Sequence, residues 1–168
     1  MNLITCISLN HCIGKEGKLA VRIPEDLKRF KKLTTGNIVV MGANTFFGDL
    51  EGKPLPNRIN VVLTKKTATL NLYGSFPTNL YFVESIPALS NILNSINSKK
   101  SKEVFIMGGA AIYNQFMGLV DTLYITHTNS IVKEGDSFFN IDWSKWNVEE
   151  VEFSEQSQCT FVKYVRKY

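Results

Sequence analysis

Apolar and polar positions along the chain form two patterns, which together predict a layered α/β fold. Short runs rich in β-branched and aromatic residues predict strands at 3–8, 38–41, 59–64, 80–83, 103–107 and 122–128. Between several of these strands, apolar residues spaced at the helical period predict helices at 24–34, about 43–48, about 86–97 and 110–118. Alternation of strands and helices favours a largely parallel sheet that is covered on both faces.

The last forty residues have a different pattern. WNVEEVEF and CTFVKYVRK are alternating runs on either side of SEQSQ, which predicts an antiparallel hairpin at one edge of the sheet. The chain contains no internal repeat, low-complexity segment or obvious linker. We therefore expect one α/β domain over residues 1–168.

The helix predicted over 24–34 carries an aspartate within its apolar stripe. Spacings of i, i+4 and i+7 place Asp26, Phe30 and Leu33 on one face. Glu25 falls on the opposite face, where basic residues three and four positions further on make it a solvated acid. A buried carboxylate is costly unless it is paired, and burial raises its pKa. Two interpretations of Asp26 stay open here: a functional carboxylate, or a helix-start acid whose side chain turns back to water.

Three glycine-containing segments join the predicted elements. The first, 11–24, is long and without periodicity, which is typical of a lid over an active site. The others, MGANTFFG and FIMGGAAIY, are strand-to-helix turns of the kind that bring backbone N–H groups to phosphate. A tight turn with close helix packing explains GGAA equally well. The absence of G-x-G-x-x-G means that the ordinary dinucleotide fold is not indicated.

Composition and charge exclude several classes of protein. A hydrophobic content of 44% and a charged content of 20% are ordinary for a soluble globular chain of 168 residues. No apolar run reaches the length of about 18 residues that a membrane span needs, and MNLITCISLN lacks the basic region of a signal peptide. Three cysteines without C-x-x-C spacing and two distant histidines predict neither a disulfide framework nor a metal site, which favours the cytoplasm. A net charge of +4 suits an anionic small molecule better than nucleic acid.

Six stretches in this order resemble dihydrofolate reductase over essentially the whole chain. They are IGKEGKLAVRIPEDLKRFKKLTTG, VVMGANTF, GKPLPNRINVVLT, VFIMGGAAIY, LYITHT and EGDSFF. The resemblance implies a single α/β domain on a mostly parallel eight-stranded sheet. It also implies hydride transfer from NADPH to C6 of 7,8-dihydrofolate, giving tetrahydrofolate for one-carbon metabolism. Expected partners are dihydrofolate, NADPH and antifolate inhibitors, with no nucleic acid or membrane partner, and the expected state is a cytoplasmic monomer.

The resemblance also implies a set of catalytic and substrate-binding residues. Asp26 falls where the family has the one ionisable residue of its pterin pocket, and Thr126 matches the threonine that hydrogen-bonds to it; Leu19 completes the catalytic set. The carboxylate would hold the pterin and favour protonation at N5, with the proton arriving through water. Arg58 would bind the α-carboxylate of the glutamate tail. The implied substrate-binding residues are Ile4, Thr5, Cys6, Asp26, Leu27, Phe30, Leu50, Leu55, Arg58, Met107 and Thr126.

A second implied set holds the cofactor NADPH. Its residues are Cys6, Ile13, Gly14, Leu19, Gly42, Ala43, Asn44, Thr45, Leu63, Thr64, Lys65, Met107, Gly108, Gly109, Ala110, Ala111, Ile112 and Tyr113. The resemblance implies that the Gly108–Gly109 peptide is cis and that residues 14–23 form the mobile loop that closes over the nicotinamide.

The chain departs from the family pattern at two places. Ala20-Val21 stands where the family usually has Pro-Trp, whose tryptophan helps to hold an active-site water and the lid; Arg22 follows where a neutral residue is expected. Ala43 stands where an arginine usually contacts the cofactor phosphates, a charge that Lys65 and the neighbouring Lys66 would partly supply.

Two alternatives to the reductase stay open on the residues. One is a pyrimidine reductase of the riboflavin pathway, which shares the fold and NADPH. The other is a weakly active protein of the same fold that binds a pterin or a nucleotide. Asp26 on an apolar face, together with Phe30 and Arg58, favours the folate enzyme. The pairing of Asp26 with Thr126 counts against a protein without catalysis, because a buried acid without a role lowers stability.

Overall fold

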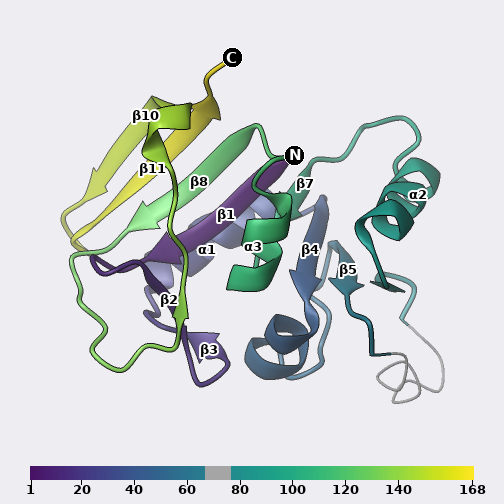
Figure 1. Ribbon diagram of the computed structural model, residues 1–168, viewed down its shortest axis with the longest axis horizontal. Helices are drawn as coiled ribbons and strands as arrows, with labels where there is room; N and C mark the ends of the chain where they lie inside the picture. The colour runs from purple at the N-terminus through teal and green to yellow at the C-terminus, as the bar shows by residue number, and fades with distance from the viewer. Residues whose placement is uncertain (67–76) are drawn as a thin grey trace.

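The computed structural model describes residues 1–66 and 77–168, and an eight-stranded sheet lies at its centre (Figure 1). In spatial order the strands are β10 (Trp146–Ser154), β11 (Cys159–Arg166), β8 (Thr122–His127), β1 (Asn2–Ile7), β7 (Val104–Ile106), β4 (Ile38–Gly42), β5 (Ile59–Leu63) and β6 (Leu80–Val83). Neighbours from β8 to β6 are parallel, whereas β11 is antiparallel to β8 and β10 is antiparallel to β11. The predicted parallel sheet and its C-terminal hairpin are confirmed.

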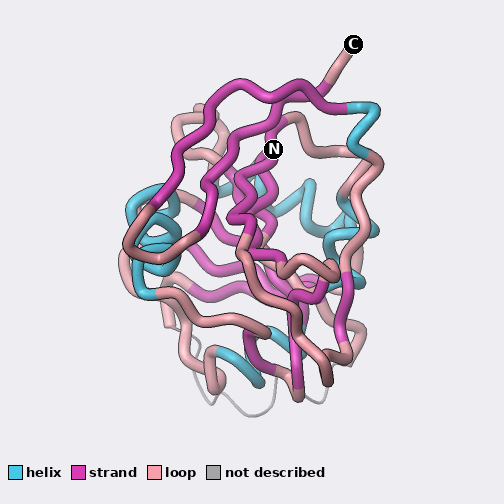
Figure 2. The backbone as a smooth tube through the Cα atoms, turned by 90° about the vertical axis from the view of Figure 1, so that its left-hand side faces the viewer, coloured by secondary structure: helices cyan, strands magenta, loops and turns pink. Residues whose placement is uncertain are grey.

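Helices cover both faces of this sheet. In Figure 1, α3 (Ala110–Phe116) lies in front of β1 and α1 (Pro24–Thr34) lies behind the sheet, and Figure 2 shows helices on both sides of the strands. The third helix, α2 (Ile86–Ile96), packs with α3 against one core cluster, and α1 packs against the other. Along β4, Val40 belongs to the first cluster and Val39 to the second. Burial on both faces explains why this strand is a continuous apolar run. None of the described helices has the length and apolar run needed to cross a membrane.

A small second sheet occupies the segment predicted as a loop over 11–24. Its strands are β3 (Lys18–Leu19), β2 (Cys12–Lys15) and β9 (Ser137–Phe138). Glu16 and Gly17, with φ angles of 51° and 74°, make the two-residue turn between β2 and β3. The prediction of a segment without secondary structure was wrong, because these strands are too short for a period and β9 is distant in the sequence.

One local prediction is confirmed and another needs correction. The short helix expected around 43–48 is present, and most of it is the π-helical turn η1 (Thr45–Asp49). The phenylalanine pairs at 46–47 and 138–139 are expected in the core from their residue type. Phe46 and Phe139 are fully buried and Phe47 packs against the core, but Phe138, the last residue of β9, lies 44% exposed.

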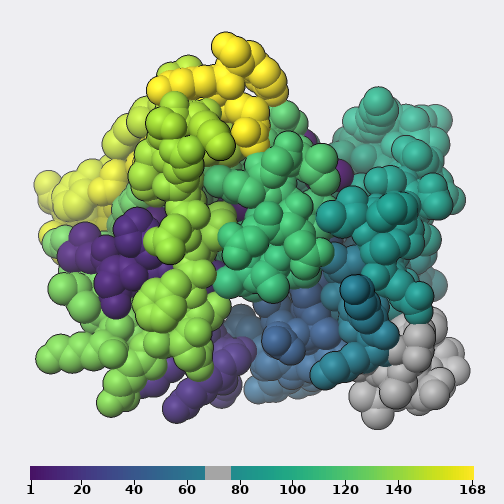
Figure 3. All heavy atoms as spheres, viewed as in Figure 1, coloured from purple at the N-terminus to yellow at the C-terminus, as the bar shows by residue number. Residues whose placement is uncertain are grey.

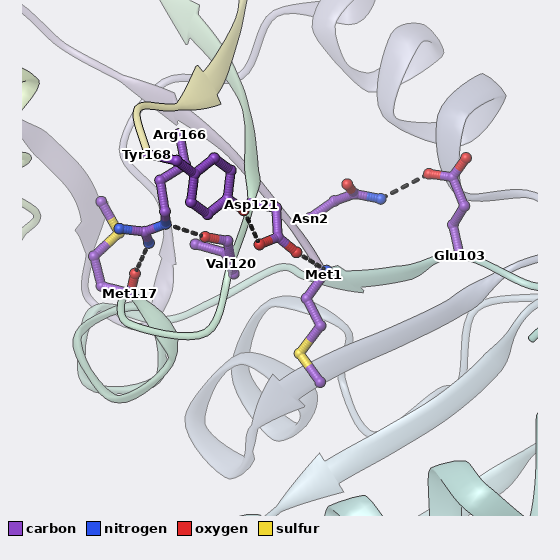
Figure 4. A network of polar contacts seen from close by, with 8 residues as sticks. All are labelled: Met1, Asn2, Glu103, Met117, Val120, Asp121, Arg166 and Tyr168. Carbon is purple, nitrogen blue, oxygen red and sulfur yellow. Dashed lines mark hydrogen bonds and ion pairs between the residues drawn. The ribbon is translucent and has the colours of Figure 1, made fainter. Parts of the chain in front are cut away.

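A polar network joins the two ends of the chain (Figure 4). It lies at the end of the eight-stranded sheet that is remote from β2 and β3 (Figure 1). Asp121 accepts hydrogen bonds of 2.9 Å from the amino group of Met1 and from the hydroxyl of Tyr168. Arg166 Nε donates to the carbonyl oxygen of Val120 at 2.9 Å. These contacts fix the start of β1. The later residues of this strand, Ile4, Thr5 and Cys6, line a cavity.

Candidate active site

One large cavity, of about 970 Å³, lies where the central parallel strands end. Its wall is built from β1, α1, the β2–β3 hairpin, the turns that follow β4 and β7, and the end of β5. The predicted catalytic, substrate-binding and cofactor-binding residues line this cavity, with the exceptions of Thr64, Lys65 and Thr126. Thr126 lies behind the wall, where it touches Asp26.

Asp26 reaches the cavity from the first turn of α1, which begins at Pro24. The hydroxyl of Thr126, on β8, donates a hydrogen bond of 2.5 Å to Asp26 Oδ1, as the resemblance implied. Burial raises the pKa of Asp26, while this hydrogen bond and the nearby Arg29 oppose the shift. The side chain therefore does not turn back to water, and it presents a carboxyl group of raised pKa to any bound ligand.

The neighbouring acid, Glu25, has a structural role that the sequence did not predict. Its Oε2 accepts hydrogen bonds from the hydroxyls of Ser154 at 2.6 Å and Ser157 at 2.8 Å, at the β10–β11 turn. These two bonds lower the pKa of Glu25, and Lys28 makes a smaller contribution. The prediction of an acid supported by basic neighbours on the helix was wrong about its main partners, because both serines are far away in the sequence.

Arg58 is held rigidly on the apolar side of the cavity. Its side chain is buried, with Nε donating to the carbonyl oxygen of Pro56 at 2.9 Å and Nη1 donating to Thr34 Oγ1 at 3.2 Å. Its guanidinium lies 5.9 Å from the ring centroid of Phe30. Burial lowers its pKa, yet arginine remains a cation.

The surroundings of Arg58 favour an anionic ligand. In the part of the chain that the structure describes, no ion pair includes Arg58. A buried cation without an acidic partner is unfavourable. A ligand carboxylate that enters the cavity would supply that partner, so Arg58 is suited to bind one end of an acidic substrate.

Elsewhere on the cavity wall, the Gly108–Gly109 peptide is cis, as expected. The N–H of Gly42 donates to the carbonyl oxygen of Gly108 at 2.8 Å, which holds this turn against the end of β4. A Cβ on Gly42 would lie 2.9 Å from Ile112 Cγ1, so a side chain at this position would separate β4 from α3. The hydroxyl of the buried Tyr113 donates to the carbonyl oxygen of Ile4 at 2.8 Å and links α3 to β1.

This turn fits the phosphates of a dinucleotide. Ala110 and Ala111 open α3, and the first N–H groups of a helix have no partner within it. Their small side chains leave the backbone accessible from the cavity. The residues present therefore fit a pyrophosphate group, although Ala43 on the same wall brings no charge to it. Lys65 and Lys66 are exposed residues off the cavity wall.

The cavity also contains residues that are absent from the implied catalytic, substrate-binding and cofactor-binding sets. They are Gly17, Lys18, Arg22, Lys31, Asp49, Asp136 and Ser137. Lys31 follows Leu27 by one helical turn, so the helical spacing could have placed it beside the cavity. Asp136 and Ser137 belong to the EGDSFF stretch that was recognised without being assigned a role. Gly17, Lys18 and Arg22 belong to residues 14–23, which the resemblance implies form the loop over the nicotinamide.

Comparison with known proteins shows a close likeness over the full chain. A family model described as dihydrofolate reductase matches residues 1–166. The chain is 33% identical over 168 residues to dihydrofolate reductase HdrB of Haloferax volcanii, covering 98% of this chain and 82% of that protein. It is 34% identical over 173 residues to dihydrofolate reductase of Staphylococcus aureus, covering 99% and 98%.

A solved structure gives the same result for the fold. Dihydrofolate reductase from Enterococcus faecalis, complexed with NADP(H) and a compound named RAB-propyl, superposes with a TM-score of 0.79 and 30% sequence identity. The likeness covers 99% of this chain and 96% of that one.

Proposed function

The chain belongs to the dihydrofolate reductase family, and on this premise we propose that its catalysis depends on Asp26. The reaction is the NADPH-dependent reduction of 7,8-dihydrofolate to 5,6,7,8-tetrahydrofolate. One observation carries the proposal for Asp26: a carboxyl group of raised pKa, anchored by Thr126, faces a cavity of about 970 Å³. Another part of the wall of that cavity fits a dinucleotide.

Asp26 would hold the pterin ring and stabilise its protonated form. Thr126 occupies Oδ1, so Oδ2 and the remaining lone pair of Oδ1 can accept hydrogen bonds from the 2-amino group and the adjacent ring N–H. A carboxylate that is fixed in this position stabilises the positive charge that develops when N5 is protonated, and C6 then accepts hydride more readily. Because Asp26 contacts the far edge of the ring, the proton would reach N5 through water.

The other walls position the two reactants. Leu27, Phe30 and Leu50 would enclose the pterin and benzoyl rings, and Arg58 would pair with the α-carboxylate of the glutamate tail. NADPH, when bound, supplies the hydride. The backbone N–H groups of Ala110 and Ala111 would hold its pyrophosphate.

We further propose that the chain works as a single-domain monomer in the cytoplasm. The residues that line the cavity come from strands, helices and turns of a single domain. Cys6, Cys12 and Cys159 are free thiols, which suits a reducing compartment.

The decisive experiment follows the loss of nicotinamide absorbance with purified protein and dihydrofolate, using NADPH and NADH in parallel. The wild type is compared with Asp26→Asn and with Glu25→Gln, a matched change of the neighbouring acid. We expect turnover with NADPH near neutral pH, a loss of about 10²- to 10³-fold in kcat/KM for Asp26→Asn, and a change of less than about 2-fold for Glu25→Gln. The NADH arm measures how far Ala43 relaxes the selection of the 2′-phosphate.

Two results would count against the proposal. Absence of turnover with either cofactor, in a protein that circular dichroism shows to be folded, would leave a pterin- or nucleotide-binding protein. Near-normal turnover by Asp26→Asn would remove the role assigned to this residue.

A further inference from the structure

Arg22 and Asp49 join two walls of the cavity that are separate in the fold. Arg22 Nη2 lies 2.9 Å from Asp49 Oδ1, and both residues line the cavity. The same oxygen accepts the backbone N–H of Leu19 at 3.4 Å. Asp49 is the last residue of η1, whereas Leu19 ends β3 and Arg22 lies between β3 and α1. In Figure 3, the purple atoms of the β2–β3 hairpin lie beside the blue atoms of η1 at the lower edge of this face.

A backbone contact strengthens this junction. A Cβ on Gly48 would lie 2.7 Å from the carbonyl oxygen of Gly17, a distance that real side chains do not tolerate. Glycine at position 48 therefore lets the turn of the hairpin rest directly on η1. We name residues 17–22 the cover segment, because they span the cavity between β2 and α1.

The hairpin has a second anchor on its other side. Asp136 Oδ2 accepts the N–H of Glu16 at 2.8 Å, and the N–H of Asp136 donates to the carbonyl oxygen of Gly14 at 3.2 Å. This anchor holds the hairpin to the segment that carries β9, and the β2–β9 pairing supports it. The contact with η1 joins the cover segment to a different part of the cavity wall. Opening of the cover segment therefore breaks this contact while the β9 side stays paired.

We propose that Arg22 and Asp49 are positioning residues whose ion pair holds the cover segment closed and sets how often it opens for ligand exchange. The proposal rests on the proposed function only for the identity of the exchanged ligands. Val21, beside Arg22, has no side-chain hydrogen-bonding group, so the polar hold on this part of the segment comes from its neighbour.

The ion pair of Arg22 and Asp49 is weak enough to break and form again repeatedly. The Asp49 side chain is 14% exposed and the Arg22 side chain is 55% exposed. Pairs with an exposed partner contribute little to stability and are screened by salt. A cover that must open in every turnover needs a contact that breaks easily and forms again in one geometry.

Hydrogen–deuterium exchange of the ligand-free protein tests the proposal without any assay of activity. Exchange in the peptide that contains the cover segment is compared among the wild type, Arg22→Gln, Asp49→Asn and the double variant. We expect each single change to speed exchange by about 2- to 5-fold, and the double change to add little, because both singles remove the same interaction. Arg22→Lys should keep most of the protection.

Two controls separate the ion pair from general effects of charge. Lys53→Gln removes a cation from the exposed pair with Glu51, close to η1, and should leave exchange of the cover segment unchanged. High salt should speed exchange in the wild type and not in Arg22→Gln. Wild-type exchange in both single variants, or effects that simply add in the double variant, would overturn the proposal.

Stopped-flow measurements then connect the ion pair to the reaction. NADPH should dissociate about 2- to 5-fold faster from Arg22→Gln, with a slower hydride-transfer step in a single turnover, and Arg22→Lys should restore both. Faster exchange in the ligand-free protein with unchanged dissociation would overturn the role in ligand exchange. If the wild type shows no turnover, the proposed function fails, while the exchange experiment still decides whether the pair holds the segment.

Discussion

The two faces of α1 present adjacent carboxylates to different regions of the molecule. Asp26 faces the cavity, where burial raises its pKa and Thr126 supplies one hydrogen bond. Glu25 faces the β10–β11 turn, where two serine hydroxyls lower its pKa. Both belong to the first turn of one helix and experience the same helix dipole. The comparison teaches that an acid that faces a cavity can bind a ligand there, whereas an acid that accepts two hydrogen bonds from a neighbouring turn stabilises the fold.

Among these predictions, substitution of Arg58 should have the largest effect on substrate binding. Arg58 is bonded to Thr34 at the end of α1, and Arg58→Gln would remove its charge. We expect KM for dihydrofolate to rise by about 10- to 100-fold with little change in kcat, because hydrogen bonds to a charged group contribute ~1.5–3 kcal/mol. Steady-state kinetics measure this, with the exposed Lys32→Gln as a control of equal charge change. An unchanged KM would show that the substrate carboxylate binds elsewhere.

Thr126→Val would sharpen the comparison by removing the hydrogen bond that Asp26 accepts. That bond lowers the pKa of Asp26, so its loss should raise this pKa further. We expect kcat/KM to fall by about 10-fold and the acid limb of its pH profile to move to higher pH. A pH profile that does not move, with a reduced rate, would mean that Thr126 acts only through packing.

The smallest expected effects are on stability, and they have opposite signs for the two acids. The native pKa of Asp26 is raised, so its contribution to stability is present below the unfolded pKa and is lost as pH rises through the native pKa. At neutral pH, Asp26→Asn should therefore unfold at a higher temperature than the wild type, by about 2 °C. This difference should disappear in acid.

For Glu25 the linkage is reversed, because its native pKa is lowered. Its contribution is present above the unfolded pKa and is lost as pH falls through the native pKa. Glu25→Gln should lower Tm slightly at neutral pH and have less effect in acid. Thermal unfolding of both variants between about pH 3 and 7 checks the pair of predictions. If both substitutions shift Tm at neutral pH in the same direction, the comparison is contradicted.

The sequence contained enough information to predict most of the sheet and much of the site. A helix over 24–34 that begins at Pro24, and a C-terminal hairpin around SEQSQ, follow from the steric and burial preferences of neighbouring residues, which periodicity records. The position of Asp26 on an apolar stripe depended on the same local information. Its specific role came from the resemblance of six motifs in order.

Tertiary structure decided the features that depend on distant segments. The partners of Glu25 lie in the β10–β11 turn, and the strand that completes the second sheet comes from 137–138. The pair of Arg22 and Asp49 forms because β3 and η1 approach each other across the cavity. Local patterns cannot specify such contacts, since the order of strands in the sheet determines which segments meet. The sequence by itself therefore determined most elements of the main sheet and placed Asp26 on an apolar helix face. Only the fold decided that Asp26 faces the cavity and which side chains hold that cavity in shape.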